Sequence, residues 1–266
     1  MIALFTLKNV PKWPFGWSFV GAMLVSPCIA LAAPISTQWS FEVSIKGSPP
    51  TPDAASKVIV AAARLFGSVT LGSGQDTGTV DKAGFSLQSK VTGAPLLSRV
   101  FDNLSVARQS SGRFVNGIAL TNRYADKRGQ SAELSMTTNL AAKRYNFAKG
   151  GVSTGSVPLT VAASDLLMAP YAFLGKPVPV KPSFLAFSDG RAIRQTALQA
   201  ANETVKLAGK TINVVRLSGN TSAGVFELWL RAEDGYPLRA RVGLGPKYGA
   251  TLDQIAKDIP SELVLF

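Results

Sequence analysis

Histidine is absent from the 266-residue sequence, and cysteine occurs once, at Cys28. Without histidine there can be no Ser-His-Asp triad, no Cys-His pair and no imidazole general base. Zinc and iron–sulfur sites that need cysteine and histidine ligands are excluded as well. The sequence also contains no Asp-x-Asp-x-Asp-Gly run, the pattern of a calcium-binding loop. We therefore expect a protein that holds no metal and no other cofactor.

Acidic residues are missing from the start of the sequence, where none precedes Glu42. Two lysines stand before an apolar run at residues 18–25, and Ala30 and Ala32 provide the small side chains that signal peptidase accepts. The run is shorter than the roughly 20 apolar residues of a transmembrane helix. Residues 1–32 are therefore predicted to be a cleavable signal peptide that directs the protein to the periplasm, with no transmembrane segment left after cleavage.

The remaining residues, 33–266, are predicted to form a single β-rich domain. Hydrophobic residues make up 46% of the sequence and charged residues 17%, which is typical of a globular protein. Residues 39–46 alternate between apolar and polar side chains, as a strand with one buried face does. One helical signal begins at Ser164 and Asp165 and ends near Gly175. With about ten to twelve short strands, the pattern predicts antiparallel sheets in a β-sandwich or an open, curved half-barrel with one short helix.

Three segments are predicted to lie outside regular strands. The glycine-rich residues 72–78 are typical of a loop, and Ser110–Gly112 is typical of a hairpin turn between two short strands. Residues 175–182 are rich in proline and are expected to be an extended connection inside the domain.

Three segments of the second half carry a resemblance to a known family. Residues 164–171 read SDLLMAPY, residues 188–190 read SDG, and residues 226–238 read FELWLRAEDGYPL. In this order they resemble a bacterial exported family known as domain of unknown function 3108, in which an Asp-x-Leu-Ser-x-x-Tyr segment precedes an Asp-Gly turn and a Trp-Leu hairpin lies near the end. The strand with Trp39 is similar to the first strand of that family, so the resemblance covers most of residues 39–259. It implies export and a β-rich fold, and it implies no catalytic residues.

Positive charge is concentrated in the middle of the chain and on one late hairpin. Residues 99–149 carry nine basic and three acidic side chains. On the late hairpin, strand alternation places Trp229 and Arg231 on one face together with Arg239 and Arg241. Arginines beside an aromatic ring suit anionic groups that accept two parallel hydrogen bonds. We predict that these four side chains form an exposed binding face, and the alternative is a solvated surface that only keeps the sheet soluble.

The charge and the export signal together narrow the class of partner. Nucleic acid is the usual partner of a basic chain, but an exported protein does not meet it, so no nucleic-acid partner is expected. Anionic lipid, lipopolysaccharide and acidic glycans are the anionic partners outside the cytoplasm. A curved half-barrel with an apolar inner face can also hold a lipid or a lipid-modified chain, by analogy of fold. The predicted function is that of a non-enzymatic periplasmic protein of the cell envelope, which binds or scaffolds a lipid, a lipoprotein or an anionic glycan.

Two alternative functions remain open. A carboxylate-dependent hydrolase, such as a glycosidase, would need two suitably spaced acids in a buried site. The candidates are Asp165, Asp189, Glu227, Glu233 and Asp234. A Gly-x-Ser-x-Gly match at residues 151–155 lacks the histidine that such a serine nucleophile requires. The second alternative is a structural subunit of an envelope complex.

Overall fold

The computed structural model describes residues 33–45, 67–95, 105–222, 224–245 and 250–260, which form one sheet of 15 strands. The strand order is β8-β7-β6-β5-β4-β3-β2-β1-β15-β14-β13-β12-β11-β10-β9. Neighbouring strands are antiparallel except for the parallel pair of β9 and β10. The prediction of a mostly β, antiparallel fold is confirmed, whereas the predicted signal peptide and Cys28 lie outside the described residues.

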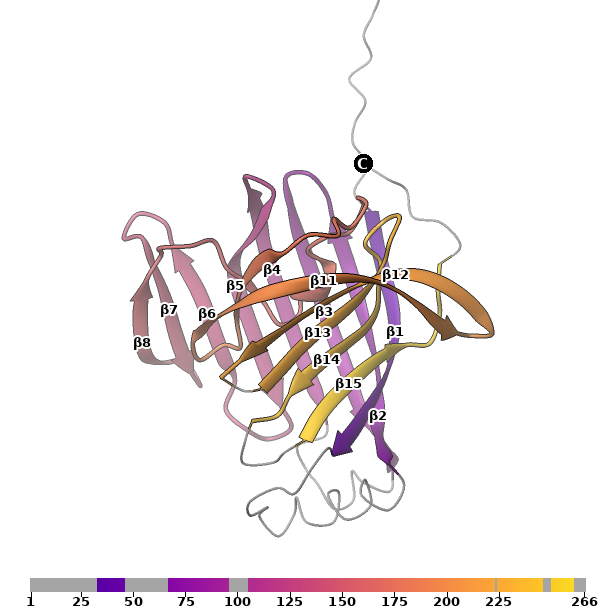
Figure 1. The fold of residues 1–266 in the computed structure, drawn as a ribbon. Coiled ribbons are helices and arrows are strands. Elements are labelled where there is room, and N and C mark those ends of the chain that lie inside the picture. The colour runs from indigo at the N-terminus through magenta and orange to yellow at the C-terminus, as the bar shows by residue number, and fades with distance from the viewer. Residues whose placement is uncertain (1–32, 46–66, 96–104, 223, 246–249, 261–266) are drawn as a thin grey trace, which may run out of the picture.

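The N-terminal half of the sheet follows the chain strand by strand (Figure 1). Its strands are β1 (Ala33–Ile45), β2 (Ser68–Val80), β3 (Gly84–Gly93), β4 (Val106–Val115), β5 (Ile118–Arg128), β6 (Leu134–Asn139), β7 (Arg144–Lys149) and β8 (Val152–Pro158). The C-terminal half contains β9 (Ser164–Asp165), the 3-10 helix η1 (Ala169–Tyr171), β10 (Ser183–Ser188), β11 (Ile193–Leu207), β12 (Lys210–Thr221), β13 (Gly224–Arg231), β14 (Pro237–Gly243) and β15 (Ala250–Ala256).

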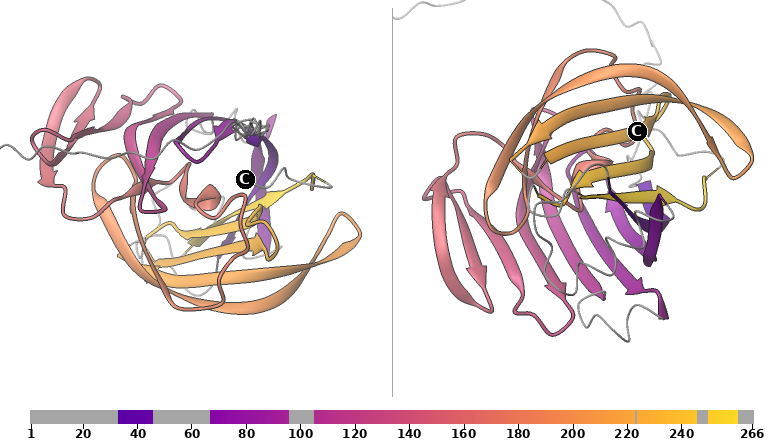
Figure 2. Two further views of the ribbon diagram at one scale, coloured as in Figure 1. Left: turned by 90° about the horizontal axis from the view of Figure 1, so that it is seen from above. Right: turned by 60° about the horizontal axis from the view of Figure 1, so that its bottom comes forward.

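The two halves of the sheet meet where β1 pairs with β15, with Trp39 opposite Ala256 and Val43 opposite Leu252. Because sheets twist and coil, the halves do not stay in one plane and instead face each other in two layers (Figure 1). The segment between β8 and β10, which contains η1, lies between these layers (Figure 2). The sheet is therefore an open, curved structure whose interior is filled by its own chain.

The alternation predicted for the first strand is confirmed. The side chains of Ile35, Thr37, Trp39, Phe41 and Val43 are buried, and those between them are exposed or half-buried. This period of two means that β1 presents one face to the interior and the other to solvent. The described residues form 15 strands, more than the ten to twelve predicted, since a short polar strand such as β8 and a two-residue strand such as β9 give little signal in a sequence.

The glycine-rich residues 72–78 are part of β2, so the prediction of a loop there is wrong. A side chain at Gly72 would place its Cβ 2.1 Å from the carbonyl oxygen of Thr92, and one at Gly78 would lie 2.0 Å from that of Ser86. Both contacts are with the backbone of the neighbouring strand β3. The glycines therefore permit close approach of two strands here, which is a known role of glycine inside a sheet.

The predicted hairpin turn at Ser110–Gly112 is also wrong, because β4 runs straight through it with a bulge between Ser111 and Gly112. The turn lies further on, at Asn116 and Gly117, whose φ angles are 51° and 76°. Two consecutive positive φ angles define the tight turn that suits the twist of antiparallel strands, and Asn-Gly is its preferred sequence. The sequence thus contained the correct signal four residues beyond the predicted turn.

The predicted helix that begins at Ser164 is wrong in extent. Ser164 and Asp165 pair with Phe187 and Ser188 as the parallel strand β9, and only the three residues of η1 are helical. In a helix that began at Ser164, Pro170 would stand in the interior, where it has no backbone N–H to donate and its ring clashes with the preceding turn. In η1 it lies in the first turn, where proline is tolerated.

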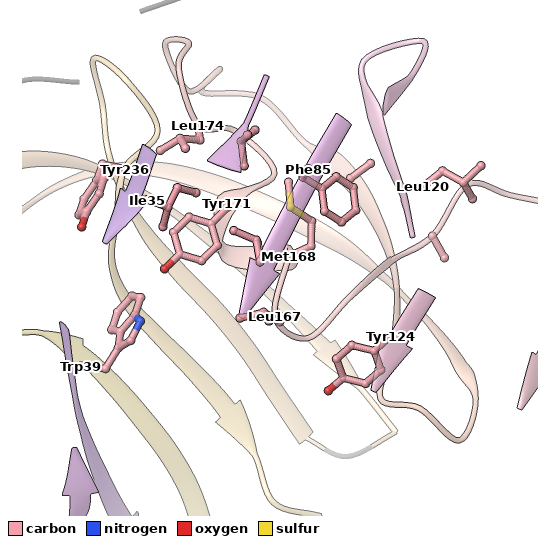
Figure 3. Close-up of a cluster of buried hydrophobic side chains, with 14 of the residues drawn as sticks. Ile35, Trp39, Phe85, Leu120, Tyr124, Leu167, Met168, Tyr171, Leu174 and Tyr236 are labelled. Carbon is pink, nitrogen blue, oxygen red and sulfur yellow. The ribbon is translucent and has the colours of Figure 1, made fainter. Parts of the chain in front are cut away.

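The main hydrophobic core is organised around residues 163–174, which we call the core segment. Its side chains Leu167, Met168, Tyr171 and Leu174 are buried among residues of the N-terminal half (Figure 3). Their neighbours in this cluster include Ile35, Phe85, Leu120 and Tyr124. Burial of a large apolar side chain stabilises a fold by roughly 1.5–3 kcal/mol, so these contacts fix the core segment between the layers. Among the described residues, no helix has the length and hydrophobicity needed to cross a lipid bilayer.

Candidate functional site

Three of the four side chains of the predicted binding face lie together. Trp229 stands opposite Arg239 across β13 and β14. The guanidinium carbon of Arg239 lies 4.8 Å from the centroid of the Trp229 ring, and that of Arg241 lies 5.4 Å from it. Both arginines are therefore within the range of a cation–π contact with the same indole.

The arginines of this face are paired with acids from other strands. Asp253 on β15 accepts hydrogen bonds from the Nε atoms of Arg239 and Arg241, each at 2.9 Å. Glu227 accepts a hydrogen bond of 3.1 Å from Arg241. Glu203 on β11 lies 3.0 Å from Nε of Arg216 and accepts a hydrogen bond of 3.1 Å from the indole of Trp229.

These pairs form a network of alternating charge, which we call the arginine network. Its members are Arg216, Arg239, Arg241, Glu203, Glu227 and Asp253. Three positive charges meet three negative charges, so the face offers no surplus charge to an anion. The sequence analysis named none of these acids as a partner of the arginines and considered Glu227 only for a hydrolase, because Glu203 and Asp253 reach the face through strand pairing.

The expectation that the whole face is exposed is wrong. Trp229 and Arg231 are each 5% exposed. The guanidinium of Arg231 donates to both carboxylate oxygens of Asp234, and its Nη1 donates to the carbonyl oxygen of Pro260 at 2.8 Å. The turn after β13 brings Asp234 against the arginine, and this hydrogen bonding raises the pKa of Arg231. Arg231 is therefore a structural residue of the turn.

A row of polar side chains crosses the inner face of the N-terminal half. Thr37, Asp76, Ser89, Arg108 and Asp126 stand opposite one another on β1 to β5. All but Arg108 are buried. Such a row inside an apolar core is stable only if its groups find hydrogen-bond partners.

This row of polar side chains forms hydrogen bonds with Tyr171 of the core segment and with Tyr236 of the C-terminal half. Asp76 accepts hydrogen bonds from the indole of Trp39 at 2.8 Å and from the hydroxyl of Tyr171 at 3.0 Å. Tyr171 and Trp39 accordingly point toward each other in Figure 3. The hydroxyl of Tyr236, just before β14, lies 2.7 Å from that of Thr37.

Asp165 anchors the core segment from its other end. Its carboxylate accepts hydrogen bonds from the hydroxyls of Ser110 and Thr121 and from the backbone N–H groups of Leu167 and Met168, at 2.9 and 3.0 Å. Burial raises the pKa of Asp165, and it raises the pKa of Asp76 in the same way. Both carboxyl groups therefore serve as acceptors that hold the interior together.

The other acids considered for a hydrolase each pair with an arginine, and Glu233 shares Arg231 with Asp234. Asp189 pairs with Arg194 at 2.7 Å, and Glu233 is 77% exposed with Arg231 at 3.6 Å. Within the described ranges, no hydrogen bond joins any two of the five candidate acids. The described residues also contain no group of three or more acids, cysteines or histidines that would hold a metal ion.

An apolar cleft of about 390 Å³ opens between the core segment, the β4–β5 turn and β10. We call it the cleft. Its apolar lining consists of Ile118, Ala119, Val161, Ala162, Ala172, Phe173, Phe184, Leu185, Ala186 and Leu198. Ile118 and Phe184 are 56% and 58% exposed, although both are large and hydrophobic. Exposed apolar side chains beside an apolar hollow are typical of a ligand entrance.

A second hollow of about 330 Å³ adjoins the cleft, and we call it the side hollow. Both are lined by Gly117, Ala172 and Lys176, and Lys82 from the β2–β3 turn lines the side hollow. This region was not predictable from the sequence, since its residues come from β2, β4, β5, β9, β10 and β11 and from the connections between them. The only available signal was the Asn-Gly turn, which would have located Ile118 at the start of a strand.

Comparison of the chain with protein-family models gave no match, and none of the curated proteins matches it. The resemblance to the domain of unknown function 3108 family therefore stays a prediction.

Proposed function

We propose that this chain is an exported, non-enzymatic protein of the cell envelope that binds a lipid chain in the cleft. The observation that carries the proposal is an apolar hollow whose entrance holds two exposed hydrophobic side chains, Ile118 and Phe184. Its volume of about 390 Å³ falls within the range of roughly 300–1,000 Å³ for small-molecule sites. Transfer of an apolar chain from water into such a hollow is favourable.

The cleft supports binding better than the arginine network does. In the network each arginine already has a carboxylate partner, so an anionic glycan would have to displace Glu203, Glu227 or Asp253. Such a replacement exchanges one ion pair for another and gains little free energy. In the cleft no carboxylate competes with a ligand, because none of its lining residues is acidic.

The proposal is tested with a neutral ligand, so that charge plays no part. Decan-1-ol is titrated into the protein and its affinity is measured by calorimetry. Replacing either exposed side chain at the entrance, Ile118→Ser or Phe184→Ser, should weaken binding about fivefold, since each removes roughly 1 kcal/mol of apolar contact.

The matched control is Val152→Ser, because Val152 is 70% exposed on the edge strand β8 and does not line the cleft. Circular dichroism confirms that each variant is folded. The proposal is wrong if decan-1-ol does not bind, or if Val152→Ser weakens binding as much as the two entrance variants do.

A further inference from the structure

Lys176 stands where the cleft meets the side hollow, because it lines both. Lys82 reaches the side hollow from a different part of the chain, the β2–β3 turn. Both lysines are exposed. Two cationic side chains thus flank one end of an apolar cleft.

Neither lysine has a charged partner among the described residues. In the part of the chain that the structure describes, Lys82 and Lys176 form no ion pair and no hydrogen bond. Asp81 also lines the side hollow, but its Oδ1 accepts the backbone N–H groups of Ala83 and Gly84 at 2.7 Å each. The three charges leave this end of the cleft positive.

A polar atom in the wall of the cleft also has no partner. The hydroxyl oxygen of Ser183, at the start of β10, is enclosed and forms no hydrogen bond with any described residue. An enclosed hydroxyl that has left water without a new partner is unfavourable, and a ligand oxygen would restore its hydrogen bond.

We propose that the ligand of the cleft is a single acyl chain that carries an anionic group, with the anion beside Lys176. This inference rests on the proposed function and specifies its ligand class. The cleft is near the lower end of the size range for ligand sites, which suits one chain rather than the two of a phospholipid. A carboxylate beside Lys176 can accept a charge-assisted hydrogen bond from its ammonium group, and Ser183 in the wall of the same cleft offers a further donor to a ligand.

The test compares three ligands with the same chain length: decanoate, decan-1-ol and decyltrimethylammonium. Calorimetric titration of the protein should give an affinity for decanoate about fivefold higher than for decan-1-ol, and the cation should bind most weakly. The preference for decanoate should shrink as salt is added, because ions screen exposed charges.

Variants assign the preference to the proposed residue. Lys176→Gln should reduce the affinity for decanoate to that for decan-1-ol and leave the alcohol unaffected, whereas Lys176→Arg keeps the charge and should keep the preference. Lys82→Gln and Ser183→Ala should reduce it less. Lys181→Gln, in the same connection but outside both hollows, is the matched control and should change nothing.

The possible failures are distinct. Equal binding of decanoate and decan-1-ol to the unmodified protein would overturn the anionic ligand class while the proposed function stands. The anionic ligand class is also overturned if Lys181→Gln acts like Lys176→Gln. If none of the three ligands binds, the proposed function and this inference are both wrong.

Discussion

The arginine network and the lysines of the cleft are two positively charged regions with opposite consequences. The network has three arginines around Trp229, but each is within 3.0 Å of a carboxylate oxygen. The cleft and the adjoining side hollow are lined by only two lysines, Lys176 and Lys82, and among the described residues neither is paired. A positive charge recruits an anionic ligand when no carboxylate of the protein already occupies it. The smaller cluster is therefore the better candidate for binding.

The largest effect is expected from the anchor of the core segment, Asp165. Asp165→Ala removes the acceptor of two hydroxyls and two backbone N–H groups, which are left buried without partners. We expect a loss of about 3 kcal/mol in the free energy of unfolding, measured by urea denaturation. Asp165→Asn should lose much less, because its amide oxygen serves the backbone groups and hydroxyls can accept from its NH₂. Equal losses for the two variants would contradict this account of the core segment.

A second prediction concerns the role of the network in stability. The double variant Arg239→Gln with Arg241→Gln leaves Asp253 buried without a cationic partner. We expect a loss of about 2 kcal/mol in the free energy of unfolding, less than for a fully buried pair because Arg239 is one-third exposed. The affinity for decanoate should not change. A stable double variant that no longer binds decanoate would reverse the comparison between the two regions.

A third prediction converts the network into an anion site. Asp253→Asn removes one acid, so that Arg239 loses its only carboxylate partner among the described residues. The free energy of unfolding should fall by about 1 kcal/mol, and retention of the protein on heparin at low salt should increase. Glu233→Gln is the control, because Glu233 is largely exposed and lies outside the network. Unchanged retention of Asp253→Asn would mean that pairing with Asp253 is not what keeps the arginines from binding an anion.

A smaller effect is expected from pH. Because burial raises the pKa of Asp165, the folded protein binds a proton at this carboxyl more tightly than the unfolded chain does. The contribution of Asp165 to stability is therefore complete below the unfolded pKa and is lost as the pH rises through the folded pKa. Relative to Asp165→Asn, the unmodified protein should lose stability as the pH rises through this window and then run parallel to the variant. Urea denaturation at a series of pH values measures the free energy of unfolding of the unmodified protein and of Asp165→Asn. A stability of the unmodified protein that rises with pH relative to the variant would contradict a raised pKa of Asp165.

The sequence predicted the features that depend on neighbouring residues along one strand. The alternation in β1 gave its buried face, and the alternation in β13 and β14 brought Trp229 onto one face with Arg239 and Arg241. The sequence Asn116-Gly117 is also a recognisable turn signal, although Ser110–Gly112 has the composition of a turn as well.

The features that depend on distant residues were not predictable in the same way. Tyr171 bonds to Asp76, 95 residues away, and Trp229 bonds to Glu203, 26 residues away. Whether a lysine or an arginine is paired depends on such long-range neighbours, which strand order decides. The sequence could therefore locate the charges but not which of them are neutralised.

The central claim is that the acyl ligand lies in the cleft and not on the arginine network. It is tested most directly by photo-crosslinking with a long-chain fatty acid that carries a diazirine, followed by mass spectrometry of the labelled peptides. We expect labels on residues 117–119, 172–173, 176 and 183–186, which line the cleft, and competition by decanoate. Labels concentrated on residues 227–241, in β13 and β14, would contradict the account.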